Sequence, residues 1–116
     1  MVFCIFVEQQ ILFIMLNITL HKTTEQKLNN YVSVYKGNYD KMFNDILSYR
    51  TIQLKKAIKT MKLDFAFFEK KYSMETEHFY QLFESGKLGD ENNDYYQWSG
   101  EYEAYKEYQK EIKSLQ

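Results

Sequence analysis

The residues best suited by type and spacing to bind a metal ion lie in an acidic segment near the C-terminus. The oxygen-bearing residues Asp90, Asn92, Asp94 and Glu101 occupy positions 1, 3, 5 and 12 of a calcium-binding loop. The sixth position of such a loop needs glycine for its sharp turn, but here it is Tyr95. The spacing therefore does not predict a calcium site, and we expect neither a metal ion nor a cofactor.

Other side chains that could do chemistry are too few or too scattered. The sequence shows no carboxylate pair, Ser/His/Asp set, Cys/His set or glycine-rich phosphate loop. Cys4, His21 and His78 cannot supply the ligands of a zinc site. A single cysteine also excludes a disulfide framework and favours a reducing compartment. We expect a cytoplasmic protein that is not an enzyme.

The charge of the chain is divided between its two halves. Residues 1–62 contain nine Lys or Arg and four Asp or Glu, a net charge of +5, and residues 63–116 contain six Lys and twelve acids, a net charge of −6. The aromatic content of 18% argues against disorder, and the absence of proline suits long helices. A basic half joined to an acidic half predicts one polyanionic partner and one basic partner.

Apolar and polar residues alternate over residues 16–22, which is the pattern of a strand with one buried and one solvent-exposed face. Leu16, Ile18 and Leu20 form the apolar side. The polar side carries Asn17, Thr19 and His21. A lone strand is not stable in water, and the rest of the chain predicts only helices. We therefore expect the strand to pair with the same strand of a second copy.

Residues 1–15 precede this strand and are apolar, with an interruption at Glu8-Gln9-Gln10. Their uninterrupted runs of seven and five residues are too short to cross a bilayer, so we expect no membrane partner. Met15 lies directly before the strand, and we expect translation to begin there. The alternative is that Leu12 and Ile14 extend the buried face of the strand. We treat residues 1–15 as an extension that says little about function.

Helical patterns fill the rest of the chain. Thr23 and Gln26 form a capping box for a first helix that Gly37 ends, and Asn38 caps the next helix. An apolar stripe with no breaker then predicts a helix of nearly thirty residues, ending near Ser73. Ser73 is expected to cap a third helix that stops at residues 85–86. A loop and a last helix, with a seam of near-heptad period over residues 95–115, complete the chain.

The order strand, helix, glycine turn, helix resembles the ribbon–helix–helix family of DNA-binding proteins, the Arc/MetJ/CopG-like group. The matching segments are residues 16–20 for the ribbon, 28–35 for the first helix, 37–38 for the turn and 42–47 for the second helix. The resemblance implies an obligate homodimer whose paired ribbons enter the major groove of operator DNA. It implies that bases are read by Asn17, Thr19 and His21, and that phosphates are contacted by Lys22, Asn38 and Lys41.

Many small proteins of this family are antitoxins, and residues 71–102 loosely resemble the tails of small prokaryotic antitoxin-like proteins. The resemblance implies that the acidic second half binds a basic toxin. Aromatic residues dominate interface hot spots, so the expected toxin-binding anchors are Phe79, Phe83, Trp98 and Tyr102. The alternative is that these four residues form the core of a hairpin between helices 73–85 and 94–115. Both hold if the hairpin folds as it binds the toxin.

The sequence thus predicts a mainly α fold, or α+β if its single strand is counted. A ribbon–helix–helix dimerisation unit (residues 16–62) would be followed by a long helix and an acidic C-terminal helical hairpin within residues 63–116. The expected function is that of a type II antitoxin that represses its operon and neutralises a toxin. The alternatives are a stand-alone ribbon–helix–helix regulator and a helical adaptor that does not bind DNA.

Overall fold

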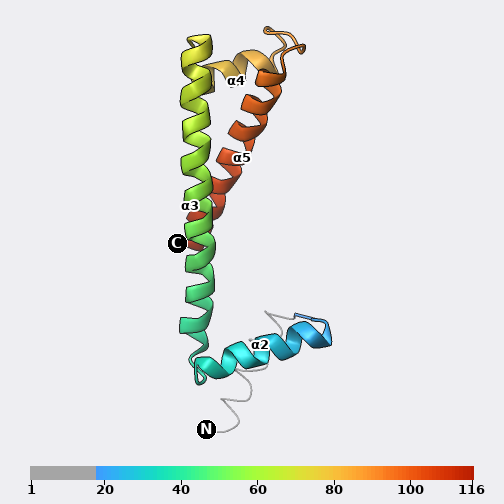
Figure 1. Ribbon diagram of the computed structural model, residues 1–116, viewed down its shortest axis with the longest axis vertical. Coiled ribbons are helices and arrows are strands. Elements are labelled where there is room, and N and C mark those ends of the chain that lie inside the picture. The colour runs from blue at the N-terminus through green and yellow to red at the C-terminus, as the bar shows by residue number, and fades with distance from the viewer. Residues whose placement is uncertain (1–17) are drawn as a thin grey trace. The chain divides into compact units, whose positions relative to one another are not determined.

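The computed structural model describes residues 18–116, which are largely helical (Figure 1). The described residues belong to two compact units, of which the first ends at Met42 and the second comprises residues 43–116. The predicted domain boundary at residues 62 and 63 falls inside a helix. The helices of the described part are α2 (Lys22–Val34), α3 (Tyr39–Tyr72), α4 (Thr76–Glu84) and α5 (Asn93–Leu115).

The predicted N-terminal strand is wrong over the residues that the structure describes. Residues 18–21 have no regular structure and Lys22 begins α2, while Leu16 and Asn17 lie outside the described residues. A strand needs a neighbouring strand to pair its backbone groups, and residues 18–116 contain none. A helix pairs these groups within itself. The ribbon–helix–helix fold is therefore corrected to an all-helical fold over residues 18–116.

The first unit contributes α2 and the turn into α3. The predicted capping box is wrong, because α2 begins at Lys22 and Thr23 lies within its first turn. The predicted stop near Gly37 is confirmed, although α2 ends earlier, at Val34. Lys36 already has a left-handed φ of 52°, and Gly37 follows with a φ of 86°, which glycine adopts at low cost. The predicted cap of the next helix is also confirmed, since Asn38 Oδ1 accepts a hydrogen bond from the Lys41 N–H at 3.1 Å.

Helix α3 has 34 residues, which confirms the long helix predicted from the unbroken apolar stripe. It contains neither glycine nor proline, and it ends just before Ser73, whose φ of 53° lies in the left-handed region. Within the second unit, Leu54, Phe65 and Phe68 on one side of α3 are buried. The apolar stripe of α3 therefore supplies one wall of the core.

Helices α4 and α5 fold back onto α3 and supply the other walls of this core (Figure 1). The Trp98 ring of α5 stacks on Phe79 of α4, with ring centroids 3.8 Å apart and an angle of 2° between the planes. The indole also stacks on Phe68 at 5.4 Å. Trp98 and Phe79 are completely buried. The core of the second unit is thus built from aromatic rings, with a large apolar area removed from water for each side chain.

Two ion pairs tie the ends of α5 to α3. At the beginning of α5, Asp94 accepts hydrogen bonds from Lys71 Nζ and from the Tyr72 hydroxyl, each at 2.6 Å. Near its end, the Arg50 guanidinium holds both carboxylate oxygens of Glu111, at 2.6 and 3.0 Å. The second contact is the bidentate geometry that favours arginine over lysine. These pairs fix the register of the two helices.

Candidate functional site

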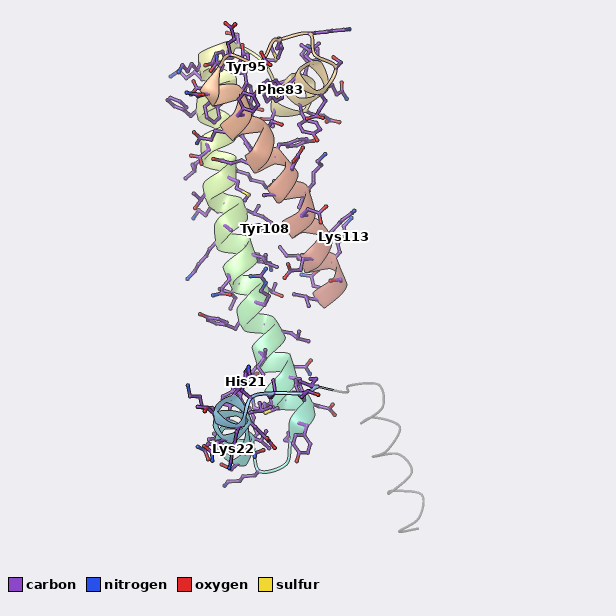
Figure 2. The ribbon with its side chains drawn as sticks, turned by 90° about the vertical axis from the view of Figure 1, so that its right-hand side faces the viewer. His21, Lys22, Phe83, Tyr95, Tyr108 and Lys113 are labelled. Atoms are coloured by element: carbon purple, nitrogen blue, oxygen red, sulfur yellow. The ribbon has the colours of Figure 1, made fainter. Side chains whose placement is uncertain are left out.

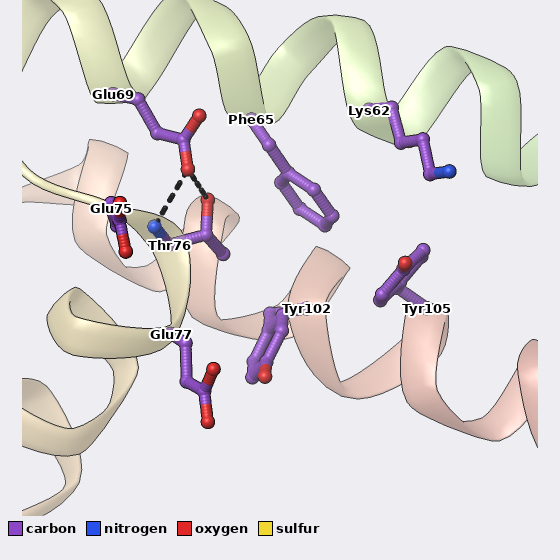
Figure 3. Close-up of a pocket in the computed structure, with 8 residues that line it drawn as sticks. All are labelled: Lys62, Phe65, Glu69, Glu75, Thr76, Glu77, Tyr102 and Tyr105. Carbon is purple, nitrogen blue, oxygen red and sulfur yellow. Dashed lines mark hydrogen bonds between the residues drawn. The ribbon is translucent and has the colours of Figure 1, made fainter.

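An open groove in the second unit is bordered by α3, the beginning of α4 and the middle of α5 (Figure 3). Its volume is about 470 Å³. We call it the acidic aromatic groove, because its lining combines carboxylates with ring side chains. The lining residues are Lys62, Phe65, Glu69, Glu75, Thr76, Glu77, Tyr102 and Tyr105.

Three rings form the aromatic side of the groove. Phe65 of α3 meets Tyr102 and Tyr105 of α5 edge to face, with ring centroids 6.1 and 5.5 Å away. The two tyrosines lie three residues apart on α5, so their rings project from the same side of the helix, with centroids 6.2 Å apart. Phe65 is buried and the tyrosines are half-buried. A ligand in the groove would therefore meet partly exposed ring surfaces.

The beginning of α4 is held in place by a chain of hydrogen bonds that crosses the core. The Trp98 indole Nε1–H donates to Thr76 Oγ1 at 3.0 Å. Thr76 Oγ1 in turn lies 3.0 Å from Glu69 Oε2, which also accepts from the Thr76 backbone N–H at 2.8 Å (Figure 3). Glu69 of α3 therefore caps α4. The predicted cap, Ser73, is wrong because α4 begins three residues later, at Thr76.

The electrostatics of the groove favour a cation. Three carboxylates line it against the single ammonium group of Lys62, and only Glu69 is engaged in capping α4. Glu77 lies beside Tyr102 in Figure 3. Burial raises the pKa of the Tyr102 hydroxyl, and the nearby charge of Glu77 raises it further. The tyrosine thus stays neutral, and the negative charge in the groove belongs to the glutamates.

A ring of the groove already accepts a cation from within the chain. Lys106 Nζ lies 4.9 Å from the centroid of the Tyr102 ring and 4.3 Å from that of Tyr80. Both distances lie within the range of a cation–π contact. The neighbouring Tyr80 hydroxyl donates to Glu103 at 3.0 Å, and this bond raises the pKa of Tyr80 to about 12. Tyrosine rings beside carboxylates are therefore a recurring environment on α4 and α5.

Those residues predicted to bind DNA that the structure describes all belong to the first unit. Thr19, His21 and Lys22 are exposed, the last two at the beginning of α2 (Figure 2), and Asn17 lies outside the described residues. Asn38 uses its side chain to cap α3, in which Lys41 is exposed. Residues 18–21 form no strand, so none of the five described side chains lies on a ribbon.

The four residues predicted to bind a toxin lie together in the second unit. Phe79 and Trp98 form the centre of its core, as the hairpin alternative expects. Phe83 is half-buried, with its ring centroid 6.1 Å from that of Tyr95 (Figure 2). Of the four, only Tyr102 lines the acidic aromatic groove. The other groove residues were not predicted, because three separate segments of the chain supply them and spacing within one helix does not show which helices meet.

The structure does not arrange the calcium-loop residues around a metal ion. Asp94 is engaged by Lys71 and Tyr72, and Asn92 caps α5 by accepting from the Asp94 N–H at 2.9 Å. Among residues 18–116, no group of His, Cys, Asp and Glu side chains is arranged to hold a metal ion. Within the same range, no helix has both the length and the apolar character needed to cross a membrane.

Compared with protein-family models, curated proteins and solved structures, this chain shows no match.

Proposed function

We propose that this protein is a helical binding module that recognises a basic protein partner through the acidic aromatic groove. The observation that supports the proposal is the position of Glu77 beside the Tyr102 ring, in a groove that Glu75 and Tyr105 also line. A guanidinium group can stack on such a ring while it donates hydrogen bonds to a neighbouring carboxylate. An arginine side chain of the partner is the ligand that best uses both features.

The charge of the surrounding helices supports the same kind of partner. Residues 63–116 carry a net charge of −6, and α4 has Glu77 in its first turn. A negative surface attracts a basic protein over a distance and increases its rate of association. A basic toxin is one such partner, so we keep the protein-binding half of the antitoxin hypothesis as part of this proposal, with the cytoplasm as its compartment.

Our proposal does not include the DNA-binding half of that hypothesis. Reading of operator DNA depended on a ribbon, and the described residues 18–21 form no strand. The homodimer was inferred from the pairing of the same ribbon. The helical adaptor, one of the alternatives drawn from the sequence, is the reading that the groove favours.

The proposal can be tested by titrating the full chain with a short peptide that contains three arginines, and by following the Tyr102 and Tyr105 ring signals by NMR. We expect Glu77→Gln to weaken binding about 3–10-fold, the loss expected when a charge-assisted hydrogen bond is replaced by a neutral one. Glu91→Gln is the matched control, because it removes one charge from an exposed loop position outside the groove.

Two results would contradict the proposal. Equal weakening by Glu77→Gln and Glu91→Gln would show that only overall charge matters. Unchanged Tyr102 and Tyr105 signals at saturating peptide would show that the peptide binds elsewhere. A peptide in which citrulline replaces arginine keeps the shape but loses the positive charge, and we expect it not to bind.

A further inference from the structure

The side of α3 that faces away from α5 carries large apolar residues that are exposed to solvent. Tyr49 is 65% exposed, Ile52 53%, Leu63 67% and Phe67 62%. Exposed lysines lie between them at the same helical spacing. We call this surface the outer face of α3. It consists of Tyr49, Ile52, Lys56, Lys59, Leu63 and Phe67.

The outer face contains no acidic residue. Between Tyr49 and the end of α3 there are two carboxylates, Asp64 and Glu69. Glu69 caps α4, and Asp64 lies beside Glu101 of α5. Both carboxylates are thus directed toward the hairpin. The outer face of α3 therefore carries only lysines and apolar side chains. From Tyr49 to Phe67 it is about 27 Å long, at about 1.5 Å per residue.

We infer that the outer face of α3 binds the surface of an anionic phospholipid membrane. Phe67 and Leu63 at one end, and Ile52 and Tyr49 at the other, can enter the boundary between headgroups and acyl chains. Lysine side chains have apolar stems, so their ammonium groups can stay at the level of the lipid phosphates while the neighbouring rings are buried. A helix that lies along the membrane surface needs no spanning segment.

The composition of the outer face of α3 argues against two other partners, a second copy of this chain and a nucleic acid. In a dimer that pairs two outer faces, the central Lys56 and Lys59 of one copy would meet the same lysines of the other, and like charges repel. A nucleic acid would pair with the lysines, but its phosphate backbone would gain nothing from Ile52 and Leu63. Alternating aliphatic and cationic side chains match the chemistry of an anionic membrane surface.

The test is flotation of the full-length protein with lipid vesicles. One set contains phosphatidylcholine with about one third phosphatidylserine, and the other contains phosphatidylcholine alone. We expect binding to the anionic vesicles only, with an affinity that falls as salt is added. Lys56→Gln and Lys59→Gln should each lower the partition coefficient about fivefold, whereas Lys87→Gln, an equal loss of charge in an exposed loop, should change it less than twofold.

Apolar substitutions distinguish membrane insertion from charge attraction alone. We expect Leu63→Ser and Phe67→Ser each to reduce vesicle binding at least fivefold, because each removes an apolar side chain that would be buried in the membrane. Tyr96→Ser is the matched control, since Tyr96 is 53% exposed but belongs to α5. The fluorescence of Trp98 in the core verifies that each variant is folded.

Three results would overturn the inference. The first is failure of the folded protein to float with anionic vesicles, and the second is equal binding to neutral vesicles. The third is binding that needs the lysines but not Leu63 or Phe67, together with tighter binding to a DNA or RNA duplex, which would assign the face to a nucleic acid. Glu77→Gln should bind vesicles like the unaltered protein. The vesicle assay therefore tests the outer face of α3 independently of the acidic aromatic groove.

Discussion

Replacement of Thr76 by valine tests the hydrogen-bond chain that positions α4. Valine has nearly the shape of threonine but cannot accept the Trp98 indole hydrogen or donate to Glu69. The Trp98 side chain is completely buried, and Thr76 is 6% exposed. Water therefore cannot replace the lost partner without opening the core.

The expected cost follows from these contacts. A buried indole N–H left without an acceptor costs about 1–3 kcal/mol. Loss of the hydroxyl bond to the Glu69 carboxylate adds about 1 kcal/mol, because that carboxylate still accepts from the Thr76 backbone N–H at 2.8 Å. The sum of these effects is a decrease of about 2–4 kcal/mol in the free energy of unfolding of the second unit.

The assay is urea unfolding followed by tryptophan fluorescence. Trp98 is the only tryptophan of the chain and lies in the core of the second unit, so its emission reports directly on that unit. Thr76→Ser is the control variant: it keeps the hydroxyl and loses one methyl group, which should cost about 1 kcal/mol. We expect the midpoint of unfolding to fall clearly further for valine than for serine.

A double-mutant cycle with Trp98→Phe isolates the indole contribution; all four proteins of the cycle are followed by circular dichroism of the helices, because Trp98→Phe removes the only tryptophan. Phenylalanine has no N–H to leave without a partner, so Thr76→Val should be less damaging in that background by about 1–2 kcal/mol. The reasoning would be refuted if valine and serine at position 76 lowered stability equally. It would also be refuted if the cost of valine were the same with and without Trp98.

Three further predictions concern the same unit. Burial raises the pKa of the Glu101 carboxyl, and the facing Asp64 carboxyl raises it further, so the folded protein disfavours the charged form at neutral pH. Glu101→Gln should therefore be more stable than the unaltered protein at neutral pH, and this difference in stability should shrink as the pH falls through the folded-state pKa of Glu101. Urea unfolding at a series of pH values measures the difference. Equal stability of the two proteins at neutral pH would contradict the prediction. Phe79→Ala should lower the free energy of unfolding by about 3–5 kcal/mol in the same assay, because it empties a completely buried site, and a loss below about 1 kcal/mol would show that the stacked core is not formed. The Tyr80 hydroxyl should titrate with a pKa of about 12, as followed by NMR. Glu103→Gln should lower this pKa, and an unchanged value would rule out the hydrogen bond between Tyr80 and Glu103.

The environment of Glu101 differs from the exposed one that the sequence alone predicts for an acidic side chain. Its Oε1 accepts from Gln97 at 3.1 Å, but its Oε2 is buried and has no hydrogen-bond partner among the described residues. Two facing carboxylates can share a hydrogen bond only when one is protonated. Only the packing of α5 on α3 brings Asp64 and Glu101 together, since they are far apart in the chain.

The predictions that were confirmed depend on residues close together in the chain. The length of α3 follows from an unbroken apolar stripe and from the absence of glycine and proline between Tyr39 and Tyr72. The turn at Gly37 and the cap at Asn38 follow from backbone chemistry within three residues. Two of the predictions that were wrong required a partner from elsewhere, whereas the capping box at Thr23 was wrong because α2 begins one residue before Thr23, at Lys22. The strand needed a second strand, and Ser73 was displaced as a cap by Glu69, which reaches α4 from α3.

The sequence by itself determined the presence of four helices between residues 22 and 115, though not where α2 and α4 begin. It also determined their aromatic character and the opposite charges of the two halves, because these depend on spacing and composition. Only the tertiary structure decided which side of each helix is used. It buried Phe79 and Trp98, left Tyr102 in a groove with Glu77, and exposed the outer face of α3. The physical reason is that burial and long-range hydrogen bonds depend on which helices meet, and spacing along one helix does not specify its neighbour.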